Sequence, residues 1–152
     1  MRYLILSFLM LSACAFHPVY VNQAYEHVCV ASIPDESGYQ MKKQLQQHFP
    51  ETNECYYTLV VDRPTHSYSD QSISDKDFIT MQQIRARTSF KLLNKKKEVV
   101  LKNTVSALGS SAITSNPYAS VVASDKTTSD LTTLLAEQIA LHVSAFLDED
   151  QK

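Results

Sequence analysis

The side chains able to do chemistry are scattered in this chain of 152 residues. Its five histidines and three cysteines show none of the short spacings, such as His-x-x-x-His or Cys-x-x-Cys, that place metal ligands on one face. The only two glycines are Gly38 and Gly109, whereas phosphate loops, dinucleotide fingerprints and nucleophile elbows need clustered glycines. Nothing selects a Ser-His-Asp site. We therefore expect a protein that is not an enzyme and that uses no metal or cofactor.

The clearest chemical pattern is a set of cations on one face of a predicted strand. Around residues 83–92 polar and apolar side chains alternate, so that Arg85, Arg87 and Lys91 share one face and apolar side chains share the other. A predicted return strand adds Lys102 to the cationic face. Guanidinium groups bind phosphate in a bidentate fork, and arginines at i and i+2 lie about 6.5–7 Å apart. The pattern is typical of an anion-binding surface and equally of an ordinary solvated sheet face.

The N-terminus has the features of a targeting signal followed by a lipidation site. Arg2 precedes an apolar stretch over residues 4–11, which is too short to span a bilayer and is typical of a signal peptide over residues 1–13. Cys14 completes the sequence Leu-Ser-Ala-Cys, which is similar to the bacterial lipobox, whose cysteine is lipidated and becomes the mature N-terminus. Two or three acyl chains hold a small domain stably on a membrane. Ala15 follows instead of the aspartate that tends to retain lipoproteins at the inner membrane, so we expect outer-membrane delivery. The alternative is an ordinary signal peptide with a chance cysteine.

Two further cysteines, Cys29 and Cys55, each lie in an apolar run typical of a strand. In an oxidising compartment they could form a disulfide. They could equally remain two free, buried thiols that pack as small hydrophobes. The sequence leaves both readings open.

Two helices and about four strands are predicted to position these residues. The first helix lies between Pro34 and Pro50, and the second closes the chain. Their expected apolar stripes are Met41, Leu45, His48 and Phe49 in the first helix and Leu131, Leu134, Leu135, Ile139, His142, Val143 and Phe146 in the second.

The remaining segments are predicted as strands and loops. Strands are expected over residues 28–33 and 55–61, followed by a polar loop over 65–77 and by the cationic strand. After a turn at residues 94–97, the return strand is expected to bury Val99, Leu101, Val105 and Ala107 and to expose Lys102, Thr104 and Ser106. The loop that follows is expected to run from Gly109 to Tyr118.

The order β-α-β-β-β-α predicts an α+β fold, a two-layer sandwich with one sheet covered by two helices. We expect a lipidated tether over residues 14–27, a single domain over 28–147 and an acidic tail over 148–152. The chain has 14 Lys and Arg against 16 Asp and Glu, for a formal net charge of −2, which gives no electrostatic reason to bind nucleic acid.

The order of these features resembles the LptE family of lipopolysaccharide-assembly lipoproteins. Residues 11–20 read Leu-Ser-Ala-Cys-Ala-Phe-His-Pro-Val-Tyr, similar to the family's Leu-x-x-Cys-Gly-Phe-x-Pro-Leu-Tyr opening. The cationic strand, the segment Asn-Pro-Tyr-Ala-Ser over 116–120 and the final helix also fit. Two departures are Ala15, where the family usually has glycine, and the three lysines over 95–97, where a turn glycine is expected.

The resemblance implies a plug inside the LptD β-barrel of the outer membrane, which supports barrel assembly and helps place lipopolysaccharide in the outer leaflet. The family's ligand contacts are basic, and Arg85 and Arg87 are the nearest matches by position, with Lys91 and Lys102 weaker. The expected partners are the barrel, lipopolysaccharide and outer-membrane lipid on the periplasmic side. The alternative is a periplasm-facing lipoprotein that binds cell wall or inhibits an enzyme through the loop over 65–77; a membrane-tethered hydrolase is the least favoured reading.

Overall fold

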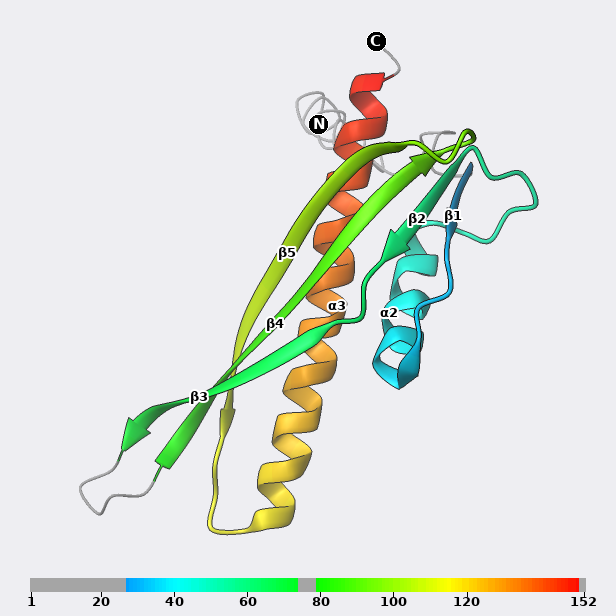
Figure 1. Ribbon diagram of the computed structural model, residues 1–152. Helices are drawn as coiled ribbons and strands as arrows, with labels where there is room; N and C mark the ends of the chain where they lie inside the picture. Colours follow the sequence, from blue (N-terminus) through cyan, green and yellow to red (C-terminus); the bar gives the residue numbers. More distant parts are fainter. Residues whose placement is uncertain (1–26, 74–78, 151–152) are drawn as a thin grey trace, which may run out of the picture.

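The computed structural model describes residues 27–73 and 79–150, which form one sheet of five strands covered on one face by two helices (Figure 1). The elements follow the chain as β1 (Val28–Val30), α2 (Asp35–His48), β2 (Tyr57–Val61), β3 (Thr65–Ile73), β4 (Ile79–Asn94), β5 (Val99–Ala112) and α3 (Pro117–Asp150). The predicted α+β class and two-layer architecture are confirmed, with one strand more than expected. The predicted signal peptide, the lipidation site Cys14 and the tether up to residue 26 lie outside the described residues.

Strand β4 is the axis of the sheet. It pairs antiparallel with β5 on one side, and on the other side with β3 along its first half and with β2 along its second half. Strand β1 adds to β2 in parallel. Because Pro64 has no N–H to donate, it separates β2 from β3. Across this break the buried Thr88 hydroxyl donates to the Asp62 carbonyl oxygen at 2.6 Å, and the Asp62 N–H donates to the Ser89 carbonyl at 2.8 Å.

The segment predicted as a polar loop over 65–77 begins as strand β3, so that prediction was wrong. Strand β3 pairs with β4 without a register shift from Thr65, opposite Arg87, to Asp70, opposite Gln82, and then with two register shifts as far as Ile73, opposite Ile79. It lies at an edge of the sheet, where side chains such as Tyr68 stay exposed and no apolar alternation is needed. Residues 74–77 of that predicted loop lie outside the described residues.

The core lies between the sheet and the two helices. Most of the predicted apolar stripes are buried there, but the structure corrects the stripe of the long helix, because Leu134 is 44% exposed and His142 is exposed. His48 is half-buried at the rim. The core residues are Val28, Ile33, Met41, Leu45, Phe49, Leu59, Val61, Ile84, Ala86, Phe90, Leu92, Val105, Ala107, Leu131, Leu135, Ala136, Ile139, Ala140, Val143 and Leu147.

Helix α3 is longer than the sequence pattern indicates. It begins at Pro117, which suits a first helical position because its missing N–H would have no partner there. Since β5 also continues to Ala112, the loop predicted from Gly109 to Tyr118 is shorter at both ends. It continues through the acidic residues as far as Asp150, which therefore belong to the helix. Its 34 residues span roughly 51 Å at 1.5 Å per residue. Among the described residues, no helix is long and apolar enough to cross a membrane.

A β-bulge corrects one residue of the predicted core face. The β4–β5 register shifts between Leu92, which lies opposite Leu101, and Leu93, which lies opposite Val99. The extra residue in β5 reverses the side-chain alternation at that end of the strand. Val99 is consequently 54% exposed, and Val100 packs against the core in its place.

Candidate functional site

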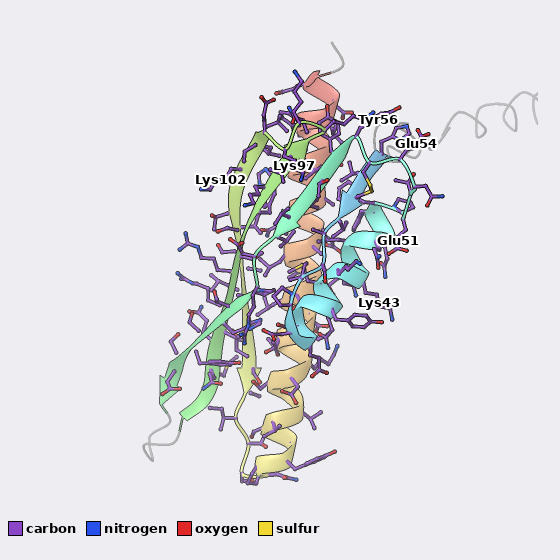
Figure 2. All side chains as sticks on the ribbon, turned by 45° about the vertical axis from the view of Figure 1, so that its right-hand side comes forward. Lys43, Glu51, Glu54, Tyr56, Lys97 and Lys102 are labelled. Atoms are coloured by element: carbon purple, nitrogen blue, oxygen red, sulfur yellow. A yellow bond between two sulfur atoms is a disulfide. The ribbon has the colours of Figure 1, made fainter. Side chains whose placement is uncertain are left out.

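The four cations that the sequence singles out lie together on the uncovered face of the sheet. Arg85, Arg87 and Lys91 of β4 and Lys102 of β5 are all exposed. The β4 side chains that alternate with them point into the core and are buried: Ile84, Ala86, Thr88, Phe90 and Leu92. In Figure 2, Lys102 projects from β5, far from Lys43 on helix α2. The amphipathic alternation of the strand thus places the predicted site on one open surface, which we call the basic face.

The register divides the basic face into an arginine pair and a lysine pair. Arg85 and Arg87 lie two residues apart on one strand, whereas Lys91 lies directly opposite Lys102 on the neighbouring strand. Between the two pairs, the hydroxyls of Ser89 and Thr104 lie 2.9 Å apart and form a hydrogen bond across the strands. The face therefore offers four cationic groups with a pair of hydrogen-bonded hydroxyls between them.

Among the described residues, no carboxylate forms an ion pair with a cation of the basic face. The ion pairs within the described residues join Lys42 to Glu51, Arg63 to Asp35 and Lys126 to Asp130, and none includes a residue of the basic face. Like charges directly opposite each other on neighbouring strands are destabilising, so Lys91 beside Lys102 is an unfavourable pair unless an anion joins it.

Asp62 is the acidic side chain that shares a hollow of about 130 Å³ with the two lysines. It forms no ion pair with either of them. Fixed guanidinium and ammonium donors beside hydroxyls are suited to binding phosphate or another anion.

The described part of the chain contains no group of three or more His, Cys, Asp or Glu side chains close enough to hold a metal ion. His66, on the core-facing side of β3, has a buried Nε2 atom without a hydrogen-bond partner. Burial lowers the pKa of His66, because a partly desolvated imidazole binds its proton less strongly.

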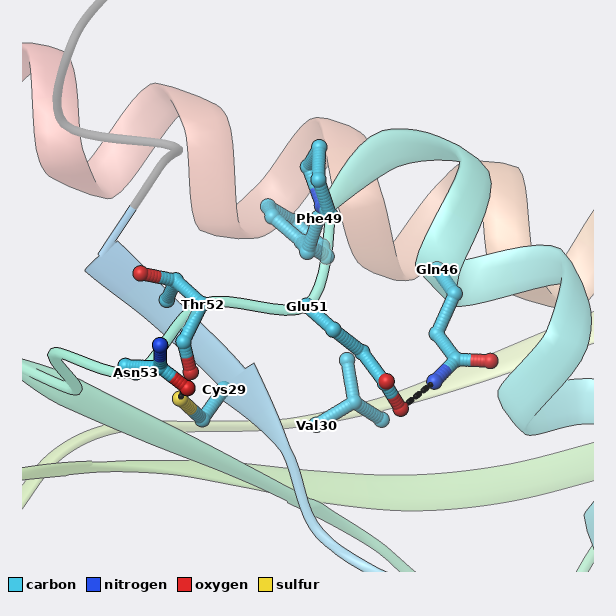
Figure 3. A pocket seen from close by; sticks show the side chains of 8 residues that line it. Cys29, Val30, Gln46, Phe49, Glu51, Thr52 and Asn53 are labelled. Atoms are coloured by element: carbon cyan, nitrogen blue, oxygen red, sulfur yellow. Dashed lines mark hydrogen bonds between the residues drawn. The ribbon is translucent and has the colours of Figure 1, made fainter.

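The second hollow of interest lies beside a disulfide (Figure 3). Cys29 and Cys55 are bonded, so of the two readings left open by the sequence, pairing is correct. The hollow has a volume of about 440 Å³ and lies between β1 and the loop that follows α2, where the Gln46 side-chain amide donates to Glu51. The bond holds this loop against β1, which indicates a structural role.

A feature that sequence reasoning missed is a stack of side chains at the end of the sheet where β1 begins. The Lys95 ammonium lies 3.5 Å from the centroid of the Tyr56 ring, and the His27 ring meets the same tyrosine edge-on at 4.3 Å between centroids. Tyr56, Tyr57, Asn94, Lys95 and Lys96 line a hollow of about 390 Å³. The adjacent tyrosines and the run of lysines were visible in the sequence, but their contact depends on the β2–β4 pairing.

The fold and the basic face define a class: an α+β domain whose sheet is covered by two helices on one face and is open and cationic on the other. No family model matches the chain, and no curated protein matches it. Solved structures do match it.

The structure of rare lipoprotein B from Shewanella oneidensis has a TM-score of 0.68 at 9% identity, covering 82% of this chain and 98% of that one. A protein from Caulobacter crescentus described as a candidate lipoprotein has a TM-score of 0.64 at 16% identity, covering 83% and 94%. A minor lipoprotein from Acinetobacter baumannii has a TM-score of 0.64 at 16% identity, covering 79% and 92%. The chain thus shares the fold of bacterial lipoproteins.

Proposed function

We propose that this chain is a non-enzymatic outer-membrane lipoprotein of lipopolysaccharide assembly. The observation that carries the proposal is the fold shared with bacterial lipoproteins over about four fifths of the chain, among them rare lipoprotein B. The lipobox-like sequence ending at Cys14 supports the same conclusion, because it is an argument from the residues themselves and not from the fold. In the proposed protein, acyl chains on Cys14 hold the domain on the periplasmic side of the outer membrane.

The proposed partner is a β-barrel of the LptD type, in which the domain acts as a plug and supports barrel assembly. A large barrel has a polar, wet lumen, so a protein that occupies it needs a polar surface. The open face of this sheet, with its cations and hydroxyls, satisfies that requirement. The proposed ligand of the basic face is the phosphorylated saccharide part of lipopolysaccharide, with Arg85 and Arg87 as the main contacts and Lys91 and Lys102 as further ones.

The direct test is co-purification of the full, tagged chain from its own cells in mild detergent. A barrel protein of the LptD type is expected to be recovered with it, and depletion of the chain is expected to reduce lipopolysaccharide at the cell surface. Recovery of the lipoprotein alone, together with normal surface lipopolysaccharide after depletion, would contradict the proposal. That result would favour a periplasm-facing binding module without a barrel partner.

Lipidation is tested separately with the variant Cys14→Ala. An uncleaved precursor without acyl chains is expected, because the thiol is the acceptor of the lipid. If labelled fatty acid is still incorporated into this variant, the lipobox interpretation is wrong.

A further inference from the structure

Strand β5 forms an open edge of the sheet. It pairs with β4 on one side, and among the described residues no strand pairs with its other side (Figure 1). Natural proteins usually protect such edges with charges, prolines or short strands. Strand β5 is 14 residues long and contains no proline, and Lys102 is its one charged residue. Such an edge is a template for adding another strand.

Hydrogen bonds on the far side of β4 show which groups of β5 face the open edge. The Arg87 carbonyl accepts a hydrogen bond from the Thr65 hydroxyl, and the Ser89 carbonyl accepts one from the Asp62 N–H, so both carbonyls point away from β5. In an antiparallel ladder, two residues that lie opposite each other either both point their backbone groups toward the partner strand or both point them away. The residues of β5 opposite Arg87 and Ser89 therefore direct their N–H and C=O groups away from β4, toward the open edge.

The residues of β5 opposite Arg87 and Ser89 are Ser106 and Thr104. The Thr104 N–H bears out this geometry, because it donates to the Asn103 side-chain oxygen at 2.8 Å instead of to β4. By the same alternation, Lys102 and Leu108 present outward backbone groups. The open edge thus has a defined set of free donors and acceptors, one of which the Asn103 side chain occupies.

The charges beside this edge indicate what kind of strand would fit. Val60, Lys91 and Lys102 form one row across three strands, and the row ends at the open edge with two cations. Among the described residues neither lysine forms an ion pair, although Asp62 shares a hollow with both. A second row contains Arg85 of β4 and Leu108 of β5, which lie opposite each other. It ends at the same edge with the apolar side chain of Leu108, which is 54% exposed. An added strand would extend both rows.

We propose that β5 accepts an extended segment of a partner protein as an additional antiparallel strand, with an acidic side chain opposite Lys102 and an apolar side chain opposite Leu108. The carboxylate would neutralise the Lys91–Lys102 pair. A second copy of this chain fits less well, because a two-fold axis between two β5 strands would place two basic faces side by side. The inference goes beyond the proposed function and does not depend on a barrel or on lipidation.

The test measures binding of a short blocked peptide to the full mature chain in detergent by fluorescence anisotropy. The peptide carries glutamate opposite Lys102 and valine opposite Leu108. Its first control is the same peptide with alternate backbone nitrogens methylated, which keeps the side chains and removes the donors. Its second control carries lysine in place of glutamate.

On the protein, Ser106→Pro removes one outward N–H without removing a hydrogen bond to β4, and Ser106→Thr is the matched control that keeps the N–H. Circular dichroism and a thermal melt verify that each variant is folded. The variant Lys102→Glu reverses the charge at the edge, and Asn103→Ala frees the Thr104 N–H.

The parent peptide is expected to bind, and backbone methylation or Ser106→Pro is expected to weaken binding at least tenfold, whereas Ser106→Thr leaves it unchanged. Lys102→Glu is expected to weaken binding of the glutamate peptide and to strengthen binding of the lysine peptide. Asn103→Ala is expected to strengthen binding of the parent peptide.

Equal binding of the methylated and parent peptides would overturn the inference. Self-association that Ser106→Pro abolishes, without peptide binding, would assign the edge to a second copy. Normal co-purification of a barrel with no peptide binding would overturn this inference and leave the proposed function intact.

Discussion

The arginine pair of the basic face gives the sharpest test of anion recognition. We predict that Arg85→Ala combined with Arg87→Ala weakens binding of lipopolysaccharide about 5- to 30-fold. Both side chains are exposed, so each ion pair with a phosphate is worth about 0.2–1 kcal/mol, with a bidentate arginine near the upper limit. Two such contacts contribute about 1–2 kcal/mol, and about 1.4 kcal/mol corresponds to tenfold in affinity.

The assay is titration of labelled lipopolysaccharide with the mature chain at low and at high salt. The affinity of the unsubstituted chain is expected to fall as salt rises, and that of the double variant is expected to fall less steeply, because fewer charges take part. The matched control is Lys43→Ala combined with Lys126→Ala, which removes the same charge from exposed positions on α2 and α3. The control variant is expected to bind as the unsubstituted chain does.

Stability separates a lost contact from a damaged fold. Neither arginine packs in the core or forms an ion pair with another described residue, so the free energy of unfolding of the double variant is expected to change by less than about 0.5 kcal/mol per site. Unchanged affinity at low salt would refute the anion site and leave the basic face as a solvated surface. An equal loss of affinity in the control variant would show that only the total charge matters.

Three further predictions concern stability. Replacing Cys29 and Cys55 by serine is expected to lower the free energy of unfolding by about 3.5 kcal/mol, because the disulfide closes a loop with a sequence separation of 26. The Tm is expected to fall by roughly 10 °C, and an unchanged thermal melt would contradict the prediction. Lys97→Gly is expected to raise the free energy of unfolding by about 1 kcal/mol in urea titrations, because Lys97 has a left-handed φ of 63° in the hairpin turn. The pKa of His66 is lowered in the folded protein, so as the pH drops through the region just below 6.5 the imidazole is protonated in the unfolded chain before it is protonated in the folded one. The free energy of unfolding is therefore expected to fall over that region. His66→Gln is expected to reduce the difference between urea titrations at pH 7.5 and 5.5.

The sequence predicts most successfully the elements that have one buried face. The alternation around Arg85 and Arg87 follows from the requirement that one face of β4 meet the core. The first helix is found for the same reason, because Met41, Leu45 and Phe49 must share a stripe. The position of the cations on one exposed face could be predicted because they alternate with those buried residues.

The features that the sequence misses depend on backbone pairing. Strand β3 is held to β4 by its backbone, so a polar segment such as Ser67 to Asp70 leaves no hydrophobic signal. The bulge that exposes Val99 depends on how the hairpin turn fits the ladder, which hydrophobic alternation does not encode. The disulfide joins β1 to the residues before β2, and these come together through the parallel pairing of the two strands.

The basic face and the open edge of β5 meet on one row, since Arg87 lies directly opposite Ser106. An anion on the arginines would contact side chains above the sheet, whereas an added strand would bind backbone groups in the plane of the sheet. The two functions are therefore separable by substitution. Ser106→Pro is expected to leave lipopolysaccharide binding unchanged, because it alters no cation. The double arginine variant is expected to change the affinity for the glutamate peptide by no more than about twofold, because Lys102 and the outward N–H groups of β5 are intact. If either variant abolishes both kinds of binding while the protein remains folded, the anion and the partner strand share one site.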